Sequence, residues 1–241
     1  MKLIILASGR GSRLNNITKK IPKCLVKVNK KSILSYLTNS FRLFNETIII
    51  TGYKSNMIKN TVKKKVTFIR NKDYLKTNMV HSLFCSSHLI NEDIIISYSD
   101  IIFESSILKK LMKCKKTTMP LNYSWLNTWK ERMSKDEIIN DAEDVKIKNK
   151  NIISIGGKII ESDFPKMQFM GLMKITKEDY FIMYKKFIEI KKPKIDFTAF
   201  INLIIETKTL EIEYIKSNSF WTEIDTSRDL KAAEVLLSNE L

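Results

Sequence analysis

The stretch that decides the fold is Lys2-Leu3-Ile4-Ile5-Leu6-Ala7-Ser8-Gly9-Arg10-Gly11-Ser12-Arg13-Leu14. Residues 2–7 form a short, largely apolar run, which is typical of a strand buried on both faces of a sheet. Without side chains at Gly9 and Gly11, the backbone N–H groups that follow can curl around a phosphate. Arg10 and Arg13 add positive charge that grips phosphate oxygens. The stretch therefore predicts a phosphate-binding loop at the carboxyl end of a first strand.

Two familiar phosphate loops do not fit this stretch. A dinucleotide-binding loop needs a third glycine where this chain has Leu14, and the Gly-Lys-Ser/Thr of a Walker loop is missing. Downstream, Pro22 fixes the chain just before Lys23, so this lysine can be held rigidly against the same phosphates. The alternative is a tight turn followed by a surface lysine. Found together at the N-terminus, the two segments favour phosphate binding.

The first half of the chain alternates apolar runs with helical patterns. The expected strands are 2–7, 47–51, 65–70 and 93–98, and the expected helices are 32–43, 54–63, 78–90 and 104–113. Such an alternation predicts an α/β fold with a mostly parallel sheet covered by helices on both faces. Ligands of such sheets bind beyond the carboxyl ends of the strands.

The second half is less regular. Its expected strands are 117–123, 168–175 and 210–215, its hairpin is 145–155, and its helices are 176–190, 197–207 and 226–239. Residues 124–144 are polar with two tryptophans, which indicates a functional loop, and we expect a small β-rich lid over about 117–175. We find no repeat or linker, so residues 1–241 are expected to form a single domain.

The composition sets broad limits on function. Hydrophobic residues make up 44% and charged residues 28% of the 241, which is an ordinary globular balance. The net charge of +16 suits polyanionic partners, but Lys is spread along the chain and basic arms are missing, so a generally basic surface without nucleic-acid binding is favoured. No apolar run reaches the roughly 18 residues of a membrane span, and the N-terminal run is too short for a signal peptide. We expect a cytoplasmic protein whose three cysteines form no disulfide framework or zinc site.

The loop and the proline-lysine pair resemble a known family. The pattern Gly-x-Gly-x-Arg-Leu followed by Pro-Lys is similar to the signature of nucleotidyltransferases that activate sugar phosphates and other small phosphates; most members have Ala where this chain has Ser8. The resemblance implies a Rossmann-like nucleotidyltransferase fold, with the loop around the triphosphate of a nucleotide. It places Arg13 and Lys23 on the phosphates as catalytic residues.

The resemblance also implies a metal site. Asp100 stands at the carboxyl end of the segment 94–100, which begins with an apolar run. The corresponding aspartate of the family binds metal. The alternative is that Asp100 is part of a plain turn at the end of a strand. Many members carry a second acid two residues on, where this chain has Ile102. Asp225, in Trp221-Thr222-Glu223-Ile224-Asp225-Thr226, matches the aspartate that completes the family's metal site. A plain helix N-cap is the alternative for Asp225, although Thr226 can cap equally well. We expect Asp100 and Asp225 to be catalytic and to bind Mg²⁺.

The resemblance extends to the nucleotide base. Asn71, Asn78 and Ser82 resemble the stretch that reads a pyrimidine in cytidylyltransferases for small phosphates, and Gly52-Tyr53 fits the wall beside the base. The alternative is that Asn78 and Ser82 merely begin a helix. The expected nucleotide-binding residues are Leu6, Ala7, Ser8, Gly9, Arg10, Gly11, Ser12, Arg13, Lys23, Gly52, Tyr53, Asn71, Asn78 and Ser82.

The segment that begins Trp129-Lys130-Glu131-Arg132 is similar to the phosphocholine, 2-aminoethylphosphonate and L-glutamine phosphate cytidylyltransferases. Segments around Asp141, Gly156, Gln168 and Asp196 continue this resemblance over nearly the whole chain. Their acceptors carry an amine and a phosphate or phosphonate, so a carboxylate would pair with the amine and a cation would hold the phosphate. Trp129 would stack on a quaternary ammonium. The expected acceptor-binding residues are Trp129, Arg132, Asp141, Glu143, Lys146 and Lys158, although Arg132 can instead pair internally.

These features predict a CTP-dependent cytidylyltransferase that joins CMP to a small amine-bearing phosphate or phosphonate and releases pyrophosphate. The resemblance implies a role in surface polysaccharide (capsule) or phosphonate decoration. A sugar-1-phosphate nucleotidyltransferase is the alternative within enzymes, and the short chain and Ile102 disfavour it. A non-catalytic nucleotide- or nucleic-acid-binding module is the alternative of another class, and the presence of Asp100 and Asp225 disfavours it. The sequence gives no indication of oligomeric state.

Overall fold

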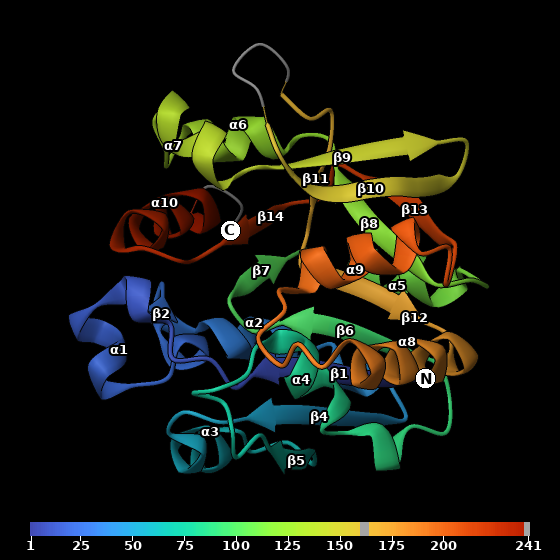
Figure 1. Ribbon diagram of the computed structural model, residues 1–241. Helices are drawn as coiled ribbons and strands as arrows, with labels where there is room; N and C mark the ends of the chain where they lie inside the picture. Colours follow the sequence, from blue (N-terminus) through green and yellow to red (C-terminus); the bar gives the residue numbers. More distant parts are fainter. Residues whose placement is uncertain (160–163, 239–241) are drawn as a thin grey trace.

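One ten-stranded sheet runs through both halves of the chain (Figure 1). The computed structural model describes residues 1–159 and 164–238. The strands are β1 (Lys2–Ala7), β4 (Glu46–Thr51), β5 (Thr67–Arg70), β6 (Ile94–Tyr98), β8 (Thr118–Asn122), β9 (Glu143–Lys148), β10 (Asn151–Lys158), β11 (Gln168–Phe169), β12 (Leu172–Ile175) and β13 (Ile212–Ser217). Their spatial order is β5-β4-β1-β6-β12-β8-β13-β10-β9, with β11 against β8. Strands β10, β11 and β12 run against the others, which confirms the predicted mixed, mostly parallel sheet.

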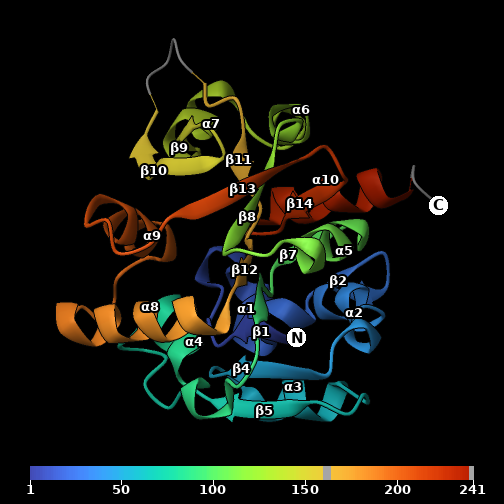
Figure 2. The same cartoon turned by 90° about the vertical axis from the view of Figure 1, so that its right-hand side faces the viewer.

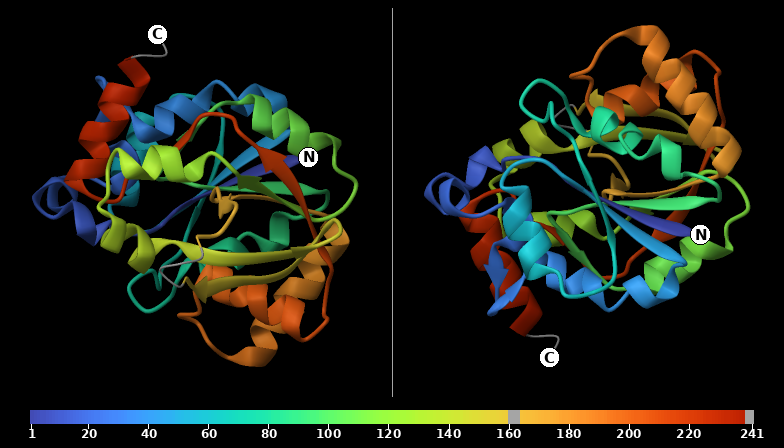
Figure 3. Two further views of the ribbon diagram at one scale, coloured as in Figure 1. Left: turned by 90° about the horizontal axis from the view of Figure 1, so that it is seen from above. Right: turned by 90° about the horizontal axis from the view of Figure 1, so that it is seen from below.

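Strand β1 lies in the parallel part of this sheet, between β4 and β6. All six of its residues are buried, because helices cover both faces. Ile4 and Leu6 pack towards the face covered by α4 (Met79–Phe84), α8 (Lys177–Ile190) and α9 (Phe197–Glu206). Leu3 and Ile5 pack towards α2 (Ile33–Thr38), α3 (Ser55–Thr61) and α5 (Ser106–Lys113) on the opposite face. Figures 2 and 3 show these two helical layers, so the predicted sheet with helices on both faces is confirmed.

Two strands that the sequence did not predict determine the geometry of the site. β7 (Ile101–Phe103) and β14 (Trp221–Glu223) pair antiparallel outside the main sheet. Ile224 N donates a hydrogen bond to Asp100 O at 2.9 Å, which extends this pairing beyond the strands. Asp100 lies just before β7 and Asp225 just after β14, so antiparallel pairing brings both aspartates to the same end of the ribbon.

The segment 117–175 differs from the predicted β-rich lid. Residues 124–144, expected to be a loop, contain α6 (Trp125–Lys130) and α7 (Lys135–Asp141). Ser134 and Glu137 form a complete capping box at the start of α7, a signature that marks a helix rather than a loop. β8 and β12 are inner strands of the main sheet, so they are not part of a separate lid. Residues 160–163 of the predicted lid lie outside the described residues.

Several predicted boundaries also shift. The expected strand 168–175 is interrupted at Gly171, whose φ of +73° breaks it into β11 and β12. A Cβ at Gly171 would lie 3.1 Å from the Tyr98 ring, so glycine suits both the backbone and the packing. The remaining elements are β2 (Lys27–Val28), β3 (Lys31–Ser32), α1 (Asn16–Lys20), α10 (Ser227–Ser238) and 3₁₀ turns at Ser12–Leu14, Lys23–Leu25, Phe41–Leu43 and Ser87–Leu89. Among the described residues, no helix is both long and apolar enough to span a bilayer.

Candidate active site

The glycine loop leaves the carboxyl end of β1 and packs against Lys23. Gly11 has a φ of +65°, in the left-handed region, and a Cβ there would lie 2.7 Å from Lys23 Cβ. Gly9 is open, since a Cβ at this position would meet nothing within 4 Å. Thr18 Oγ1 donates to Gly11 O at 2.8 Å and helps to fix the turn. The loop therefore offers an open backbone at Gly9 and a close approach to Lys23 at Gly11.

Lys23 and Arg13 meet two carboxylates in front of this loop. Lys23 Nζ lies between Asp100 and Asp225, at 2.5 Å from Asp100 Oδ2 and in direct contact with Asp225 Oδ1. Arg13 Nη2 lies 2.9 Å from Asp225 Oδ1. Burial opposes the ammonium of Lys23, but Asp100 and Asp225 outweigh it and raise the lysine pKa. Burial also opposes the Asp225 carboxylate, but Lys23 and Arg13 hold the pKa of Asp225 below its usual value. Lys23, Arg13 and Asp225 are thus charged at neutral pH.

Three carboxylates at this centre have the arrangement of a metal site. Asp100, Glu223 and Asp225 each offer an oxygen, and these oxygens all lie within 4.8 Å of one another. Asp100 Oδ1 is buried without a hydrogen-bond partner among the described residues, which suits an oxygen that ligates a cation. Burial, followed by Asp225 and Asp100, raises the pKa of Glu223 well above its usual value. Hard oxygen donors of this kind fit Mg²⁺. Glu223 was not predicted as a ligand, although it lies two residues before Asp225 in the quoted segment.

The structure also decides how α10 begins. Thr226 Oγ1 accepts a hydrogen bond from Asp229 N at 3.2 Å, while Asp229 Oδ2 accepts from Thr226 N at 2.8 Å. Thr226 and Asp229 therefore cap the helix reciprocally. This leaves the Asp225 side chain to Lys23 and Arg13, so its cap alternative does not apply.

Two cavities meet at this centre. The first has a volume of about 270 Å³, lies over the glycine loop, and is lined by Leu6, Ala7, Ser8, Gly9, Gly11, Ser12, Arg13, Pro22, Lys23, Cys24, Tyr74, Thr77, Asn78, Met79, Ser99, Asp100 and Asp225. The second, of about 210 Å³, lies beneath α6 and α7 and is lined by Arg13, Met79, Tyr98, Ile101, Trp129, Asp141, Glu143, Gln168, Phe169, Gly171, Asp196, Phe197, Thr198, Trp221, Glu223 and Asp225. Arg13, Met79 and Asp225 line both. A phosphate in the first cavity and a group in the second can therefore meet beside Asp225.

Comparison with known proteins agrees with this arrangement. The model of the MobA-like NTP transferase domain matches residues 3–122. The chain is 31% identical to the CTP:phosphoglutamine cytidylyltransferase of Campylobacter jejuni, over 96% of this chain and 98% of that protein. This chain belongs to the nucleotidyltransferase family.

More distant relatives point the same way. The choline-phosphate cytidylyltransferase of Streptococcus pneumoniae is 24% identical over the full length of both chains. The inositol-1-phosphate CTP transferase from T. maritima superposes with a TM-score of 0.76, at 19% identity over 96% of this chain and 94% of that one. The fold predicted for this nucleotidyltransferase is therefore confirmed over nearly its whole length.

The loop predicted to bind the triphosphate follows β1 and borders the first cavity. Residues 6–9 and 11–13 line the first cavity together with Lys23. Arg10 instead lies over the Tyr53 ring, with its Cζ 5.8 Å from the ring centroid. Gly52 and Tyr53 support the loop from the end of β4, because Tyr53 N donates to Ser8 O at 3.1 Å. A Cβ at Gly52 would lie 2.6 Å from that same oxygen, so the approach depends on glycine.

The residues predicted to read the base are placed differently from expectation. Ser8 Oγ and Ser82 Oγ lie 2.7 Å apart, and Asn71 Nδ2 donates to Ser82 Oγ at 3.0 Å. Asn71 and Ser82 are each 1% exposed and do not line the cavity. Their hydrogen-bonding groups serve to join the loop, β5 and α4. Asn78 does line the cavity, but it caps α4 through Met79 N and donates to Asp196 Oδ1 at 2.6 Å.

The predicted acceptor residues divide into two groups. Trp129, Asp141 and Glu143 line the second cavity, as expected. Arg132 is 2% exposed and pairs with Asp229, so the internal pairing considered as its alternative is what the structure shows. The exposed Lys146 and Lys158 do not line this cavity, so none of the three cations considered for the acceptor phosphate lies in its wall. Among the described lining residues, Arg13 is the only cation.

Several residues of the second cavity were not predicted. Asp196, Phe197 and Thr198 come from the start of α9, while Gln168 and Phe169 form β11. Both segments were part of the family resemblance, so the signal was present, but no residue type in them indicated a role. Thr198 Oγ1 donates to Glu143 Oε1 at 2.7 Å and thereby orients that carboxylate.

Proposed function

We propose that this nucleotidyltransferase transfers CMP from CTP to a small phosphate or phosphonate that also carries an amine. The observation that carries the proposal is the second cavity, which joins the phosphate loop at Arg13 and Asp225. Five carboxylates line it: Asp141, Glu143, Asp196, Glu223 and Asp225. The relatives named for phosphoglutamine and choline phosphate support both CTP as the donor and an acceptor of this class.

The charge of the second cavity favours a cationic acceptor group. Burial raises the pKa of Asp141 and of Glu143, so both carboxylates lack sufficient counter-charge in the free protein. A protonated amine or quaternary ammonium would supply that charge. Aromatic side chains of Tyr98, Trp129 and Phe197 also line the cavity, and such surfaces favour an organic cation over a metal ion.

The reaction follows from the way the two cavities meet. An oxygen of the acceptor phosphate attacks the α-phosphorus of CTP, and the bond from that phosphorus to the oxygen bridging to the β-phosphorus breaks. The electron pair leaves with pyrophosphate, and the new bond joins CMP to the acceptor, which gives a CDP-linked product where the acceptor is a phosphate. The acceptor oxygen is already an anion, so no side chain has to remove a proton.

Positioning and charge neutralisation would provide the catalysis. Lys23 and Arg13 would bind the triphosphate oxygens. The open backbone at Gly9 would let the phosphates approach the N–H groups of the loop. Asp100 and Asp225, with Glu223, would hold Mg²⁺, which neutralises phosphate charge when bound. Lys23 balances Asp100 and Asp225 in the free protein and keeps their carboxylates together.

A pyrophosphate-release assay tests this function. The purified protein with Mg²⁺ is given CTP, UTP, ATP or GTP, each with phosphocholine, 2-aminoethylphosphonate or phosphoglutamine, and products are identified by mass spectrometry. We expect release with CTP and at least one acceptor, and a product heavier than the acceptor by one CMP unit. A faster reaction with UTP or ATP, or release without an acceptor adduct, would contradict the proposal.

A further inference from the structure

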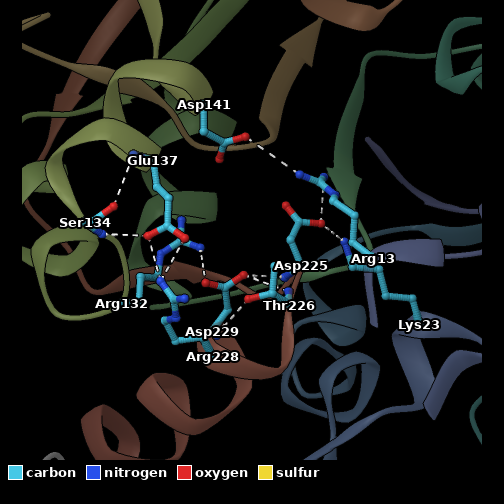
Figure 4. A network of polar contacts seen from close by, with 10 residues as sticks. All are labelled: Arg13, Lys23, Arg132, Ser134, Glu137, Asp141, Asp225, Thr226, Arg228 and Asp229. Atoms are coloured by element: carbon cyan, nitrogen blue, oxygen red, sulfur yellow. Dashed lines mark hydrogen bonds and ion pairs between the residues drawn. The ribbon is translucent and has the colours of Figure 1, made fainter. Parts of the chain in front are cut away.

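Two chains of polar contacts connect α6–α7 with Asp225 (Figure 4). The first runs through the solvent-facing Arg13, whose Nη1 lies 3.7 Å from Asp141 Oδ1 at the end of α7. The second is buried and runs through Arg132 and Asp229 to the backbone of Asp225. The chemistry proposed above uses the first chain and leaves the second unexplained.

Arg132 is an unusual residue to bury. It lies in the turn between α6 and α7, and its side chain is 1% exposed. Its Cζ lies 4.8 Å from the centroid of the Trp129 ring, and its Nη1 lies 2.7 Å from Asp229 Oδ1. Its Nε and Nη2 have no hydrogen-bond partner among the described residues. Burying a guanidinium with so few partners is costly, and such pairs are weak contributors to stability.

Asp229 connects Arg132 to the backbone at Asp225 and Thr226. Its Oδ1 faces Arg132, while its Oδ2 accepts hydrogen bonds from Asp225 N at 3.0 Å and Thr226 N at 2.8 Å. The Asp229 side chain is 1% exposed. One carboxylate thus contacts both the turn that carries Asp225 and the turn that carries Arg132.

Neither helix capping nor helix packing requires this ion pair. The capping box of Thr226 and Asp229 is complete without Arg132. Arg228 Nη1 lies 2.6 Å from Glu137 Oε2 and already joins α10 to α7 at the exposed edge of the same contact. The buried Arg132–Asp229 pair differs from the exposed Arg228–Glu137 pair in its contact with Trp129. The Trp129 ring lies against Arg132, and Trp129 also lines the second cavity.

We propose that Arg132 and Asp229 are positioning residues that couple the filling of the acceptor cavity to the placement of Asp225. A ligand against Trp129 restrains Arg132, Arg132 restrains Asp229, and Asp229 holds the Asp225 and Thr226 amides. The Asp225 carboxylate is then fixed beside Lys23 and Arg13 when both substrates are present. This inference rests on the proposed function, since it assigns the second cavity to the acceptor.

Amide hydrogen exchange tests the coupling without relying on turnover. In the substrate-free protein, we expect R132M to speed exchange at Asp225 and Thr226, and the matched control R228M to leave it unchanged. In the wild-type protein, saturating 2-aminoethylphosphonate with Mg²⁺ and CMP should slow exchange at these two amides. Wild-type exchange that is unaffected by a ligand shown to bind, or an R132M pattern equal to wild type, would overturn the proposal.

Kinetics separates positioning from a structural role. Loss of a group that orients a catalytic ligand lowers activity about 10–100-fold, so R132M should lower kcat by that factor and leave the KM for CTP within about twofold. The double variant R132M/D229N removes both buried charges, so its melting temperature should return towards that of the wild type while kcat stays low. Recovery of kcat together with stability would assign the pair a structural role only. A wild-type protein without CMP transfer would instead contradict the proposed function, and the exchange measurement would still report on the coupling.

Discussion

The two cavities share Arg13, Met79 and Asp225 but are built in contrasting ways. The first cavity, proposed above to bind the nucleotide and called the nucleotide cavity below, takes most of its wall from residues 6–13 and 22–24, and its cations Arg13 and Lys23 suit a polyanion. The second cavity, proposed above to bind the acceptor and called the acceptor cavity below, takes its wall from Arg13 and from segments between residues 79 and 225, and five carboxylates line it. The nucleotide side therefore depends on a short local motif, while the acceptor side depends on how distant elements pack.

This contrast separates the general part of the chemistry from the specific part. Phosphate binding needs open backbone and positive charge, which a glycine loop after a strand supplies in few residues. Selecting an acceptor needs opposed side chains around a closed volume, and these come from different elements. Changes at the shared centre should impair the whole reaction, whereas changes on one side should affect one substrate.

The largest effect is expected at the shared centre. D225N removes one carboxylate charge beside Lys23 and Arg13 and weakens any Mg²⁺ bound there, so kcat should fall at least about 100-fold. D100N should act in the same direction. Steady-state pyrophosphate release measures the loss, and circular dichroism with thermal melting verifies that each variant folds. Near-normal turnover in either variant would remove that aspartate from the mechanism.

A smaller effect is expected within the nucleotide loop. In G11A, the new Cβ requires a left-handed backbone and lies 2.7 Å from Lys23 Cβ, so the protein should lose about 1–3 kcal/mol of stability and bind CTP less tightly. G9A is the matched control, because its Cβ meets nothing within 4 Å and should change stability by less than about 0.5 kcal/mol. Chemical denaturation gives both values. Equal stabilities for G11A and G9A would show that the loop does not depend on its contact with Lys23.

The acceptor side should show a pH dependence that reflects the raised pKa of Glu143. Burial raises the pKa of Glu143, so its carboxyl keeps a proton to higher pH in the folded protein than in the unfolded chain. Stability linked to this proton is complete below the unfolded pKa and is lost as pH rises through the raised folded pKa. An amine needs the carboxylate form, so acceptor affinity should fall as pH drops through that pKa.

E143Q tests this account. The variant should bind an amine-bearing acceptor about tenfold more weakly at pH 8, since a hydrogen bond to a charged group contributes about 1.5 kcal/mol. The acceptor affinity of the variant should depend less steeply on pH, because residue 143 no longer titrates and Asp141 still does. The variant should also be slightly more stable than wild type at high pH, because it no longer buries the Glu143 carboxylate. Calorimetric titration and thermal melts at pH 5 to 8 provide the data. A matched loss of CTP affinity would mean that Glu143 acts on the whole site rather than on one substrate.

The smallest effect is expected at Lys146. Its side chain is 67% exposed and lies 3.5 Å from Asp144, outside the acceptor cavity. K146A should leave the acceptor KM within about twofold of wild type and stability within about 0.5 kcal/mol, as for other surface changes. An acceptor KM raised several-fold would return Lys146 to the phosphate-binding role first expected from the sequence.

The difference between the cavities also decided what the sequence could predict. The first strand and the loop after it were predicted from local patterns, namely the apolar run 2–7 and the two glycines in Gly9-Arg10-Gly11. Both lie where predicted. Asp100 and Asp225 were paired through resemblance, and the β7–β14 contact that joins them was not predicted because strands of three residues leave little periodic signal.

Predictions about charged side chains were weaker. Arg132 was expected to bind phosphate, yet it is buried against Asp229, a partner 97 positions away that no local pattern reveals. Asn71 and Ser82 were expected to read the base, yet they bond to each other and to the glycine loop. A polar residue type indicates that a partner exists, but only packing determines which partner it is.

The measurement that tests the central claim most directly compares two acceptors under one condition. The kcat/KM for 2-aminoethylphosphonate or phosphocholine is measured against that for glycerol phosphate, with saturating CTP and Mg²⁺, in wild type and in E143Q. The account predicts a strong preference for an amine-bearing acceptor in the wild-type protein, and a smaller preference in E143Q because one carboxylate is lost. Equal kcat/KM values for glycerol phosphate and the amine-bearing acceptors in the wild-type protein would contradict it.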